Sequence, residues 1–225
     1  RLIGEIYAIG LPSVILIAIG SVMTFLMNKI LITYHAAHET AATAFGTYFK
    51  LNSFIFMPVF GMNNGVVPIV AYNYGAQNRR RMVETIKRGA LYASCIMVFG
   101  TILFWAIPGP LLKIFDASDT LLSVGIPALR IISLSFCMAG ASIALGSSFQ
   151  ALGKSFYSMI TSIVRQLVFL IPIAYVLARY GVSVGNSDLV WWSYPVAEVF
   201  SLVLTLAFFR RLYKTIIAPL PEGRE

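Results

Sequence analysis

The stretch that decides the fold is PVFGMNNGVVPIVAYNYGAQNRRR, residues 58–81. It begins as strongly apolar sequence and ends in three consecutive arginines. Pro58 and Pro68 each remove a backbone hydrogen-bond donor, so a helix through them is expected to bend where neighbouring groups satisfy the freed carbonyls. Gly61 and Gly65 share one helix face, where another backbone can come close. We therefore predict a kinked helix with these four residues as its hinge.

Two amides lie inside the same apolar run. Asn63 and Asn64 stand between the two glycines, and an unpaired polar group at membrane depth costs about 2–7 kcal/mol on transfer scales. Amides in such a position indicate that the helix borders a cavity. A helix that bends only to pack, with no part in transport, is the alternative interpretation.

The composition of the whole chain places this helix in a membrane. The 225 residues are 58% hydrophobic and 12% charged, whereas soluble domains contain about 25% charged residues. Apolar runs recur without a hydrophilic block long enough to fold alone. We therefore expect one membrane domain over residues 1–225, in contact with the lipid bilayer.

Six apolar segments are each long enough to cross a hydrocarbon core, which needs about 20 residues. The chain is thus predicted to be all-α, a polytopic membrane protein with a six-transmembrane-helix bundle. The second and fourth segments are so long that they are expected to tilt or kink. The predicted spans are 6–34, 41–72, 89–107, 121–150, 157–178 and 189–209.

Basic residues divide the connections between spans into two classes. One class holds nine Lys and Arg residues, whereas the other holds only Lys113 and Arg179. The positive-inside rule then places both termini in the cytoplasm. Residues 77–88, the longest basic connection, are expected to form a short amphipathic helix along the cytoplasmic surface. Topology accounts for the net charge of +8, so we expect no nucleic-acid partner.

Ionisable residues inside the spans need partners, because a charge at mid-membrane costs about 2.5–3.5 kcal/mol on insertion scales. Arg165 and Gln166 fall in the fifth span, and Tyr194 and Glu198 fall on one face of the sixth. We predict an intramembrane network in which Arg165 and Glu198 approach each other or share a water-filled space. Two alternatives stay open: both residues are purely structural, or Glu198 carries a coupling cation.

Further candidates for cavity lining are polar or soft side chains at helical spacing. They are Asn28, Met57, Asn63, Asn64, Ser133 and Ser147.

No constellation of catalytic residues is present in the sequence, and we expect neither an enzyme nor a metal site or cofactor. The histidine group HAAHE, residues 35–39, matches no zinc-protease spacing and is expected to be solvated in a short outer loop. Cys95 and Cys137 fall in apolar runs, where buried free thiols are more common than a disulfide.

Four segments together resemble the second half of a MATE (multidrug and toxic compound extrusion) transporter of the bacterial type. They are GMNNGVVPIVAYNYGAQNRRR at 61–81, FQALGK at 149–154, SIVRQLVFLIPIAYVLARYGV at 162–182 and VWWSYPVAEVFSLVLTL at 190–206. The resemblance implies a twelve-helix antiporter of the bacterial cytoplasmic (inner) membrane, in which two six-helix bundles flank a central cavity. Such a transporter exports cationic or amphiphilic drugs against an inward flow of Na⁺ or H⁺.

The resemblance also implies that this chain is the C-terminal bundle and that its partner is the N-terminal six-helix half of the same transporter. The start at Arg1 rather than Met is interpreted in the same way, as a sign of a fragment. Some members carry cation-binding carboxylates on the first and fourth helices of this bundle. Here Glu5 lies at the cytoplasmic threshold, and the fourth span has Arg130 and no acid, so the coupling ion is expected in the N-terminal half.

Two other functions remain open at this point. One is a lipid or lipid-linked oligosaccharide flippase of the same wider superfamily, which would need a more strongly cationic cavity. The other is a membrane scaffold that transports nothing.

Overall fold

The computed structural model describes residues 2–221, without the side chains of residues 2–13, 16 and 17. All elements in this part of the chain are helices. In chain order they are α1 (Leu2–Tyr34), α2 (His38–Gly75), α3 (Arg79–Ala106), α4 (Pro108–Lys113), α5 (Asp119–Ser133), α6 (Phe136–Ala151), α7 (Ser155–Ile163), the π-helix η1 (Val164–Leu170), α8 (Ile171–Val184), the 3₁₀-helix η2 (Ser187–Trp192), α9 (Ser193–Leu212) and the π-helix η3 (Tyr213–Ile217).

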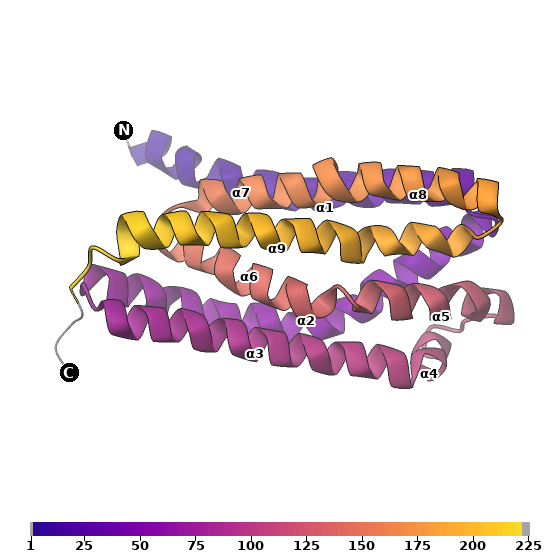
Figure 1. The fold of residues 1–225 in the computed structure, drawn as a ribbon, viewed down its shortest axis with the longest axis horizontal. Helices are drawn as coiled ribbons and strands as arrows, with labels where there is room; N and C mark the ends of the chain where they lie inside the picture. Colours follow the sequence, from indigo (N-terminus) through magenta and orange to yellow (C-terminus); the bar gives the residue numbers. More distant parts are fainter. Residues whose placement is uncertain (1, 222–225) are drawn as a thin grey trace.

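The helices lie lengthwise in one elongated bundle (Figure 1). Among the described residues, four segments are long and apolar enough to cross a membrane: α2, α3, the stretch α7–η1–α8 and the stretch η2–α9–η3. The bent pair α5–α6 adds a fifth, and the part of α1 from Ala18 to Tyr34 is a shorter apolar helix. The predicted all-α membrane bundle is therefore confirmed.

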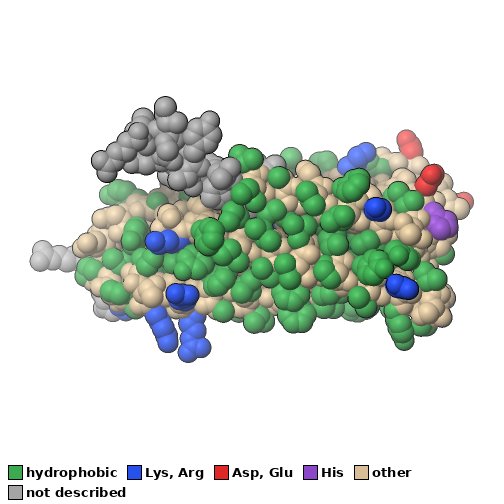
Figure 2. Space-filling view, turned by 90° about the horizontal axis from the view of Figure 1, so that it is seen from above, with side chains coloured by type: hydrophobic (Ala, Val, Ile, Leu, Met, Phe, Trp, Pro, Cys, Tyr) green, Lys and Arg blue, Asp and Glu red, His purple; other side chains and the backbone are tan. Residues whose placement is uncertain are grey.

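The two ends of the bundle differ. α1 begins and η3 ends at the same end, which we call the proximal end, and the α1–α2 turn lies at the opposite, distal end (Figure 1). Figure 2 shows hydrophobic side chains along the middle of one face, with acidic and histidine side chains gathered at the distal end. Cys95 and Cys137 are free thiols as predicted, but both are exposed on the bundle surface. Their predicted burial is wrong, because both side chains point away from the helix interfaces.

A sharp bend interrupts the fourth crossing segment. α5 and α6 meet at an angle of 51°, where the N–H of Leu134 donates to the carbonyl of Ile131 and the N–H of Ser135 donates to that of Ile132. Bonds to the third residue back tighten a helix turn. The hydroxyl of Ser135 also donates to the Ile132 carbonyl at 2.7 Å. The bend therefore has a backbone cause and no proline at its centre.

α2 passes through Pro58 and Pro68 as one continuous helix of 38 residues. Gly61 and Gly65 are exposed, and a Cβ built on either would meet no atom within 4 Å. The close backbone approach predicted at these glycines is thus absent within the described chain. A Cβ on Gly140 of α6, in contrast, would lie 3.0 Å from the carbonyl oxygen of Ala93 in α3. These two helices are packed against each other at backbone distance.

Residues 79–88 are the first turns of α3 and not a separate surface helix, which corrects the prediction for 77–88. The side chain of Asn78 caps the helix by accepting the N–H of Arg81 at 3.1 Å. Glu84 accepts a hydrogen bond from Arg88 at 2.6 Å, one turn later. Gly89 lies inside the helix, where it is buried and does not interrupt it. The basic segment and the span therefore form a single helix.

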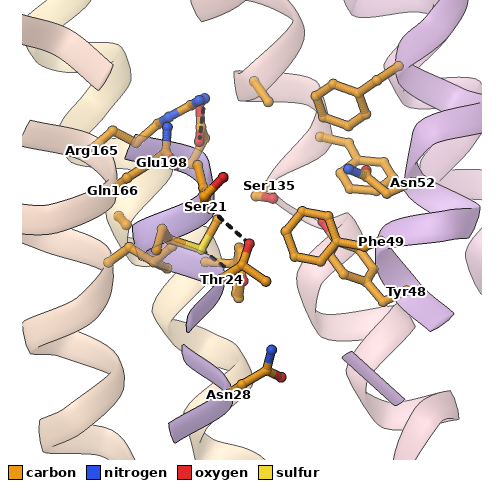
Figure 3. Close-up of a pocket in the computed structure, with 18 of the residues that line it drawn as sticks. Ser21, Thr24, Asn28, Tyr48, Phe49, Asn52, Ser135, Arg165, Gln166 and Glu198 are labelled. Carbon is orange, nitrogen blue, oxygen red and sulfur yellow. Dashed lines mark hydrogen bonds and ion pairs between the residues drawn. The ribbon is translucent and has the colours of Figure 1, made fainter. Parts of the chain in front are cut away.

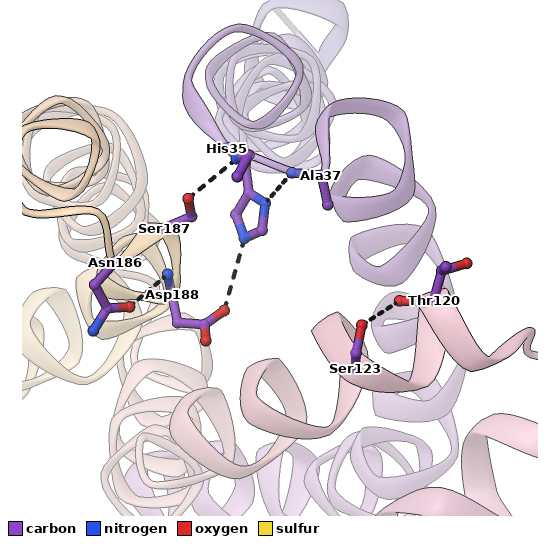
Figure 4. A network of polar contacts seen from close by, with 8 residues as sticks. His35, Ala37, Thr120, Ser123, Asn186, Ser187 and Asp188 are labelled. Carbon is purple, nitrogen blue, oxygen red and sulfur yellow. Dashed lines mark hydrogen bonds and ion pairs between the residues drawn. The ribbon is translucent and has the colours of Figure 1, made fainter.

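The turn between α1 and α2 is tied to η2 at the distal end (Figure 4). Nδ1 of His35 accepts the N–H of Ala37 at 3.1 Å, and Nε2 lies 3.7 Å from a carboxylate oxygen of Asp188. The His35 ring is 5% exposed and lies 6.0 Å from the ring of Trp191, centroid to centroid. The expectation that the histidine group 35–39 is solvated is therefore wrong for His35, because a tryptophan far along the chain covers it.

Candidate functional site

A cavity of about 690 Å³ lies in the distal half of the bundle; we call it the distal chamber (Figure 3). Its wall combines aromatic rings, hydroxyls and amides from α1, α2, α6, η1 and α9. The lining residues are Gly20, Ser21, Met23, Thr24, Phe25, Asn28, Tyr48, Phe49, Asn52, Phe56, Ser135, Phe136, Ala139, Arg165, Gln166, Leu170, Tyr194, Ala197 and Glu198.

An ion pair lies at the wall of this chamber. Nη1 of Arg165 is 3.6 Å from Oε2 of Glu198, and the two side chains are 28% and 9% exposed (Figure 3). Gln166 and Tyr194 line the same chamber, so the structure brings together all four residues of the predicted network. Burying both members keeps the local charge balanced, whereas removing one would leave the other uncompensated in a medium of low polarity.

The backbone around Arg165 has an unusual geometry that places it in this position. η1 is a π-helix that ends directly before Ile171 and Pro172, at the start of α8. Pro172 has no N–H to donate, which weakens regular α-helical bonding one turn earlier. A π-turn widens the helix and is frequent at functional sites. The widened turn allows Arg165 and Gln166, adjacent in the sequence, to face one chamber together.

A second cavity of about 310 Å³ lies in the proximal half; we call it the proximal chamber. Ten of its sixteen lining residues carry a hydroxyl or amide side chain, and Phe56 and Arg165 line both chambers. The lining residues are Phe56, Phe60, Asn63, Asn64, Val67, Ser142, Ile143, Gly146, Ser147, Gln150, Ser158, Thr161, Ser162, Arg165, Ser201 and Thr205. Ser201 and Thr205 continue the polar face of Glu198 on α9, and each is 2% exposed.

Several buried polar atoms beside the chambers have no hydrogen-bond partner in the described structure. They are Oδ1 of Asn52, both amide atoms of Asn63, Oγ of Ser142 and Oε1 of Glu198. A buried group without a partner costs about 1–3 kcal/mol. Such groups are satisfied when water or a polar ligand occupies the adjacent space, so the chambers are equipped to hold polar molecules.

The predicted cavity residues divide among several places. Asn28 lines the distal chamber, whereas Asn63, Asn64 and Ser147 line the proximal one.

Two predicted cavity residues lie outside both chambers. Ser133 is fully buried, and its hydroxyl donates to the carbonyl of Arg130 at 3.0 Å. Its assignment as cavity lining is wrong because the hydroxyl is hydrogen-bonded to the backbone next to the bend between α5 and α6. Met57 is 66% exposed and points out of the bundle from α2. It lines neither chamber.

Sequence reasoning missed part of the distal chamber. Ser21 and Thr24 on α1 precede Asn28 by seven and four residues, so the three share one helix face, and all three line the chamber. Tyr48 and Asn52 line it four residues apart on α2. These polar positions at helical spacing were present in the sequence and would have indicated the chamber. Among the residues that the structure describes, no three metal-ligating side chains converge.

Comparisons with known proteins agree on one family. The family model MatE matches residues 12–176. The multidrug export protein MepA of Staphylococcus haemolyticus (strain JCSC1435) is 26% identical over 204 residues, which make up 90% of this chain and 43% of that protein. MepA of Staphylococcus aureus (strain MRSA252) is 25% identical over 199 residues, 88% of this chain and 42% of that protein. The chain therefore spans less than half the length of the curated relatives it matches.

Solved structures show the same fold. An outward-facing conformation of a multidrug resistance MATE family transporter of the MOP superfamily superposes with a TM-score of 0.86 at 19% identity, over 94% of this chain and 47% of that one. A MOP superfamily transporter from Pyrococcus furiosus, described as having a binding pocket of reverse polarity, gives a TM-score of 0.86 at 20% identity over 94% of this chain and 47% of that one. The described helices thus form half of a MATE fold.

Proposed function

The chain belongs to the MatE family, and we propose that it works as one six-helix half of a multidrug efflux transporter. The complete transporter would export cationic or amphiphilic drugs by alternating access, in exchange for Na⁺ or H⁺. The observation that carries this proposal is the distal chamber, a cavity of about 690 Å³ with an aromatic and polar wall. Pockets of this size and composition bury drug-sized ligands.

The wall of the distal chamber suits amphiphilic cations. The rings of Tyr48, Phe49 and Phe56 offer faces that attract a cation or stack on an aromatic drug. Asn28 and Asn52 add amide oxygens that accept hydrogen bonds from a ligand. The ion pair between Arg165 and Glu198 contributes no net charge, so aromatic faces and amide oxygens would select the ligand.

The exposed face of α2 supports a second half as partner. Met57, Gly61, Gly65 and Pro68 recur every three or four residues on this helix, and all four are exposed. A stripe of small and soft exposed residues suits close packing against another helix in the membrane. We assign this stripe to the interface on which the two halves rock, with Pro58 to Pro68 as the hinge.

We place the coupling cation in the second half. Among the described residues, the one acid in the two chamber walls is Glu198, which lines the distal chamber and is compensated by Arg165. Glu5, the acid that the sequence places near the start of the first span, has its side chain outside the described residues. Neither chamber therefore offers an uncompensated carboxylate to a cation.

Orientation in the bacterial inner membrane follows from charge. Nine Lys and Arg residues belong to the proximal connections, and the positive-inside rule assigns that end to the cytoplasm. Both termini are then cytoplasmic, and the distal chamber lies in the outer half of the membrane.

Reconstitution in vesicles tests the proposal. We expect the purified chain alone to give no drug-dependent Na⁺ or H⁺ flux, and we expect flux when the N-terminal half of a related transporter is added. Translocation of a fluorescent lipid without drug flux would support the flippase alternative. Absence of both activities from a correctly assembled pair would leave the chain as a scaffold and overturn the proposal.

A further inference from the structure

A third cavity, of about 390 Å³, lies on the outside of the bundle between α1 and α8; we call it the α1–α8 groove. The two helices lie side by side in the distal half of the bundle (Figure 1). The groove shares no lining residue with either chamber, and half of its lining residues are exposed. They are Leu26, Lys29, Ile30, Thr33, Tyr34, Ile171, Pro172 and Tyr175.

The sequence of α1 separates the groove from the distal chamber. Leu26, Lys29, Ile30 and Thr33 occupy positions i, i+3, i+4 and i+7, so they share one face of the helix. At 3.6 residues per turn, the polar α1 residues that line the distal chamber fall on the opposite face. α1 therefore contributes one face to the chamber inside the bundle and the other to the groove on its surface.

Most of the groove wall is aliphatic. Its apolar side chains come from α1 and from the first two residues of α8, Ile171 and Pro172. The hydroxyl of Thr33 donates to the carbonyl of Lys29 at 2.7 Å, so it is already satisfied within the helix. An apolar groove that opens on the bilayer is filled by a lipid chain through van der Waals packing.

Two tyrosines mark the distal end of the groove. Tyr34 is the last residue of α1, and its ring lies 5.6 Å from that of Tyr175, centroid to centroid, at an interplanar angle of 88°. Tyrosine is enriched where a membrane meets water, because its ring is apolar and its hydroxyl is polar. The distal end of the groove is thus expected at the level of the lipid headgroups.

Two basic side chains flank this end. Lys29 lines the groove and is exposed, and Nη1 of Arg179 donates to the hydroxyl of Tyr175 at 3.4 Å. Asp188, an acid at the distal end, lies beside His35 instead. Among the described residues neither Lys29 nor Arg179 takes part in an ion pair, and no acid lines the groove. Both cations are therefore available to an anionic group, and both residue types bind phosphate.

We propose that the α1–α8 groove binds an anionic phospholipid. One acyl chain lies against the aliphatic wall, and the phosphate contacts Lys29 and Arg179 at the level of the tyrosines. The two cations disfavour a cationic drug in the groove, and a free anion would leave the apolar wall uncovered. The orientation proposed above places this lipid in the outer leaflet, but its binding requires neither that orientation nor transport.

Fluorescence quenching at the rim of the groove tests the proposal. A bimane label is attached at Ile32→Cys, because Ile32 is 47% exposed and follows Lys29 by three residues on α1. Cys95 and Cys137, both exposed, are first replaced by alanine. The labelled 225-residue chain is reconstituted in phosphatidylcholine vesicles, in which dibrominated phosphatidylglycerol or dibrominated phosphatidylcholine with the same chains replaces part of the lipid.

We expect phosphatidylglycerol to occupy the groove about 5- to 30-fold more tightly than phosphatidylcholine, because each cation near the membrane surface favours an anionic lipid about fivefold. Equal quenching by the two brominated lipids would overturn the proposal.

A second label, at Ile102→Cys, is the matched control. Ile102 is exposed on α3, and Trp105, one turn further, donates its ring N–H to the carbonyl of Arg130 at 3.1 Å. Arg130 is exposed as well, so this control site has a basic residue nearby but does not line the groove. The preference for phosphatidylglycerol should stay below about twofold here. An equal preference at residues 32 and 102 would show that any surface cation suffices, and would contradict a specific site.

Matched variants assign the preference to the two cations. Lys29→Gln and Arg179→Gln should each lower the preference at residue 32 about fivefold, whereas Arg130→Gln should leave it unchanged. Both variants keep a long polar side chain at an exposed position, so the fold is expected to persist. An unchanged preference in both would remove the phosphate contacts from the proposal.

Two further additions separate the phospholipid from other occupants. Glycerophosphoglycerol, the headgroup without chains, should not reduce quenching by dibrominated phosphatidylglycerol, and displacement would reduce the groove to a site for anions only. Adding an N-terminal half should leave quenching at residue 32 unchanged. Loss of quenching by both lipids would assign the groove to the second half and overturn the proposal. No drug flux enters these measurements, so their failure is distinguishable from a failure of the proposed transport function.

Discussion

Gly61 on α2 and Gly140 on α6 are the same residue in the same kind of apolar helix, but their surroundings are opposite. A Cβ on Gly140 would lie 3.0 Å from the Ala93 carbonyl, whereas one on Gly61 would meet nothing within 4 Å. Small residues in membrane helices permit close packing, but their presence alone does not identify the helix against which they pack. At Gly140 the partner is the chain's own α3. At Gly61 the structure offers no partner, and we propose one outside the chain.

The contrast is sharpest in folding stability. We expect Gly140→Leu to destabilise the bundle by about 3 kcal/mol or more, because the added side chain would collide with the backbone of α3. Gly61→Leu should melt like the unaltered chain. Thermal unfolding in detergent, followed by size-exclusion chromatography, compares the two variants. Similar melting of both would remove the distinction between a closed and an open face.

The ion pair between Arg165 and Glu198, like Gly140, lies among helices of the chain itself. Glu198→Gln leaves Arg165 without its counter-charge, and we expect a loss of up to about 3 kcal/mol in stability. In a reassembled transporter, the ion dependence of drug flux should persist in the fraction that folds. Unchanged stability together with abolished ion dependence would reassign Glu198 as the cation-coupling acid.

The open face should matter for transport instead of folding. Gly65→Leu, on the same exposed stripe of α2, should fold normally but reduce drug flux of the reassembled transporter at least about tenfold, since about 1.4 kcal/mol of lost interface packing suffices. Ile102→Leu, on an exposed position of α3, is the control and should transport normally. Normal flux in Gly65→Leu would argue against a partner on this face.

The smallest effect is expected at the distal tie between the α1–α2 turn and η2. The hydroxyl of Ser187 accepts the N–H of Ala36 at 3.1 Å, and Ser187→Ala removes this acceptor at a cost of about 1 kcal/mol. Hydrogen exchange should rise locally in the turn while drug binding stays unchanged. Exchange that rises across the entire bundle would show that the tie has a larger structural role than proposed.

Much of the fold was predictable from the sequence because hydropathy reports burial in lipid directly. The pairing of Arg165 with Glu198 followed from opposite charges on consecutive spans, since neither is tolerated alone in an apolar medium. The burial of His35 was not predictable, because Trp191, which covers it, lies far away in the sequence. The length of the fourth span predicted a tilt or a kink, but not that the bend would lie at Leu134 and Ser135, because its position depends on a change in backbone hydrogen bonding that hydropathy does not report.

The candidate site was predicted less completely than the fold. Asn28 and Asn63 were found as isolated amides in apolar helices, but nothing local separates Asn28 in one chamber from Asn63 in the other. The failure at Ser133 has the same origin. A serine in an apolar helix either faces a cavity or donates to its own backbone, and Ser133 donates to the Arg130 carbonyl. The helix packing decides between the two.

The accessibility of residue 61 to oxygen tests the central claim most directly. A spin label at Gly61→Cys and a control label at Ile102→Cys are compared by electron paramagnetic resonance in bilayers, after Cys95 and Cys137, both exposed, are replaced by alanine. We predict that adding an N-terminal half lowers oxygen accessibility at residue 61 and leaves residue 102 unchanged. Unchanged accessibility at residue 61 in a pair that is demonstrably assembled would contradict the account.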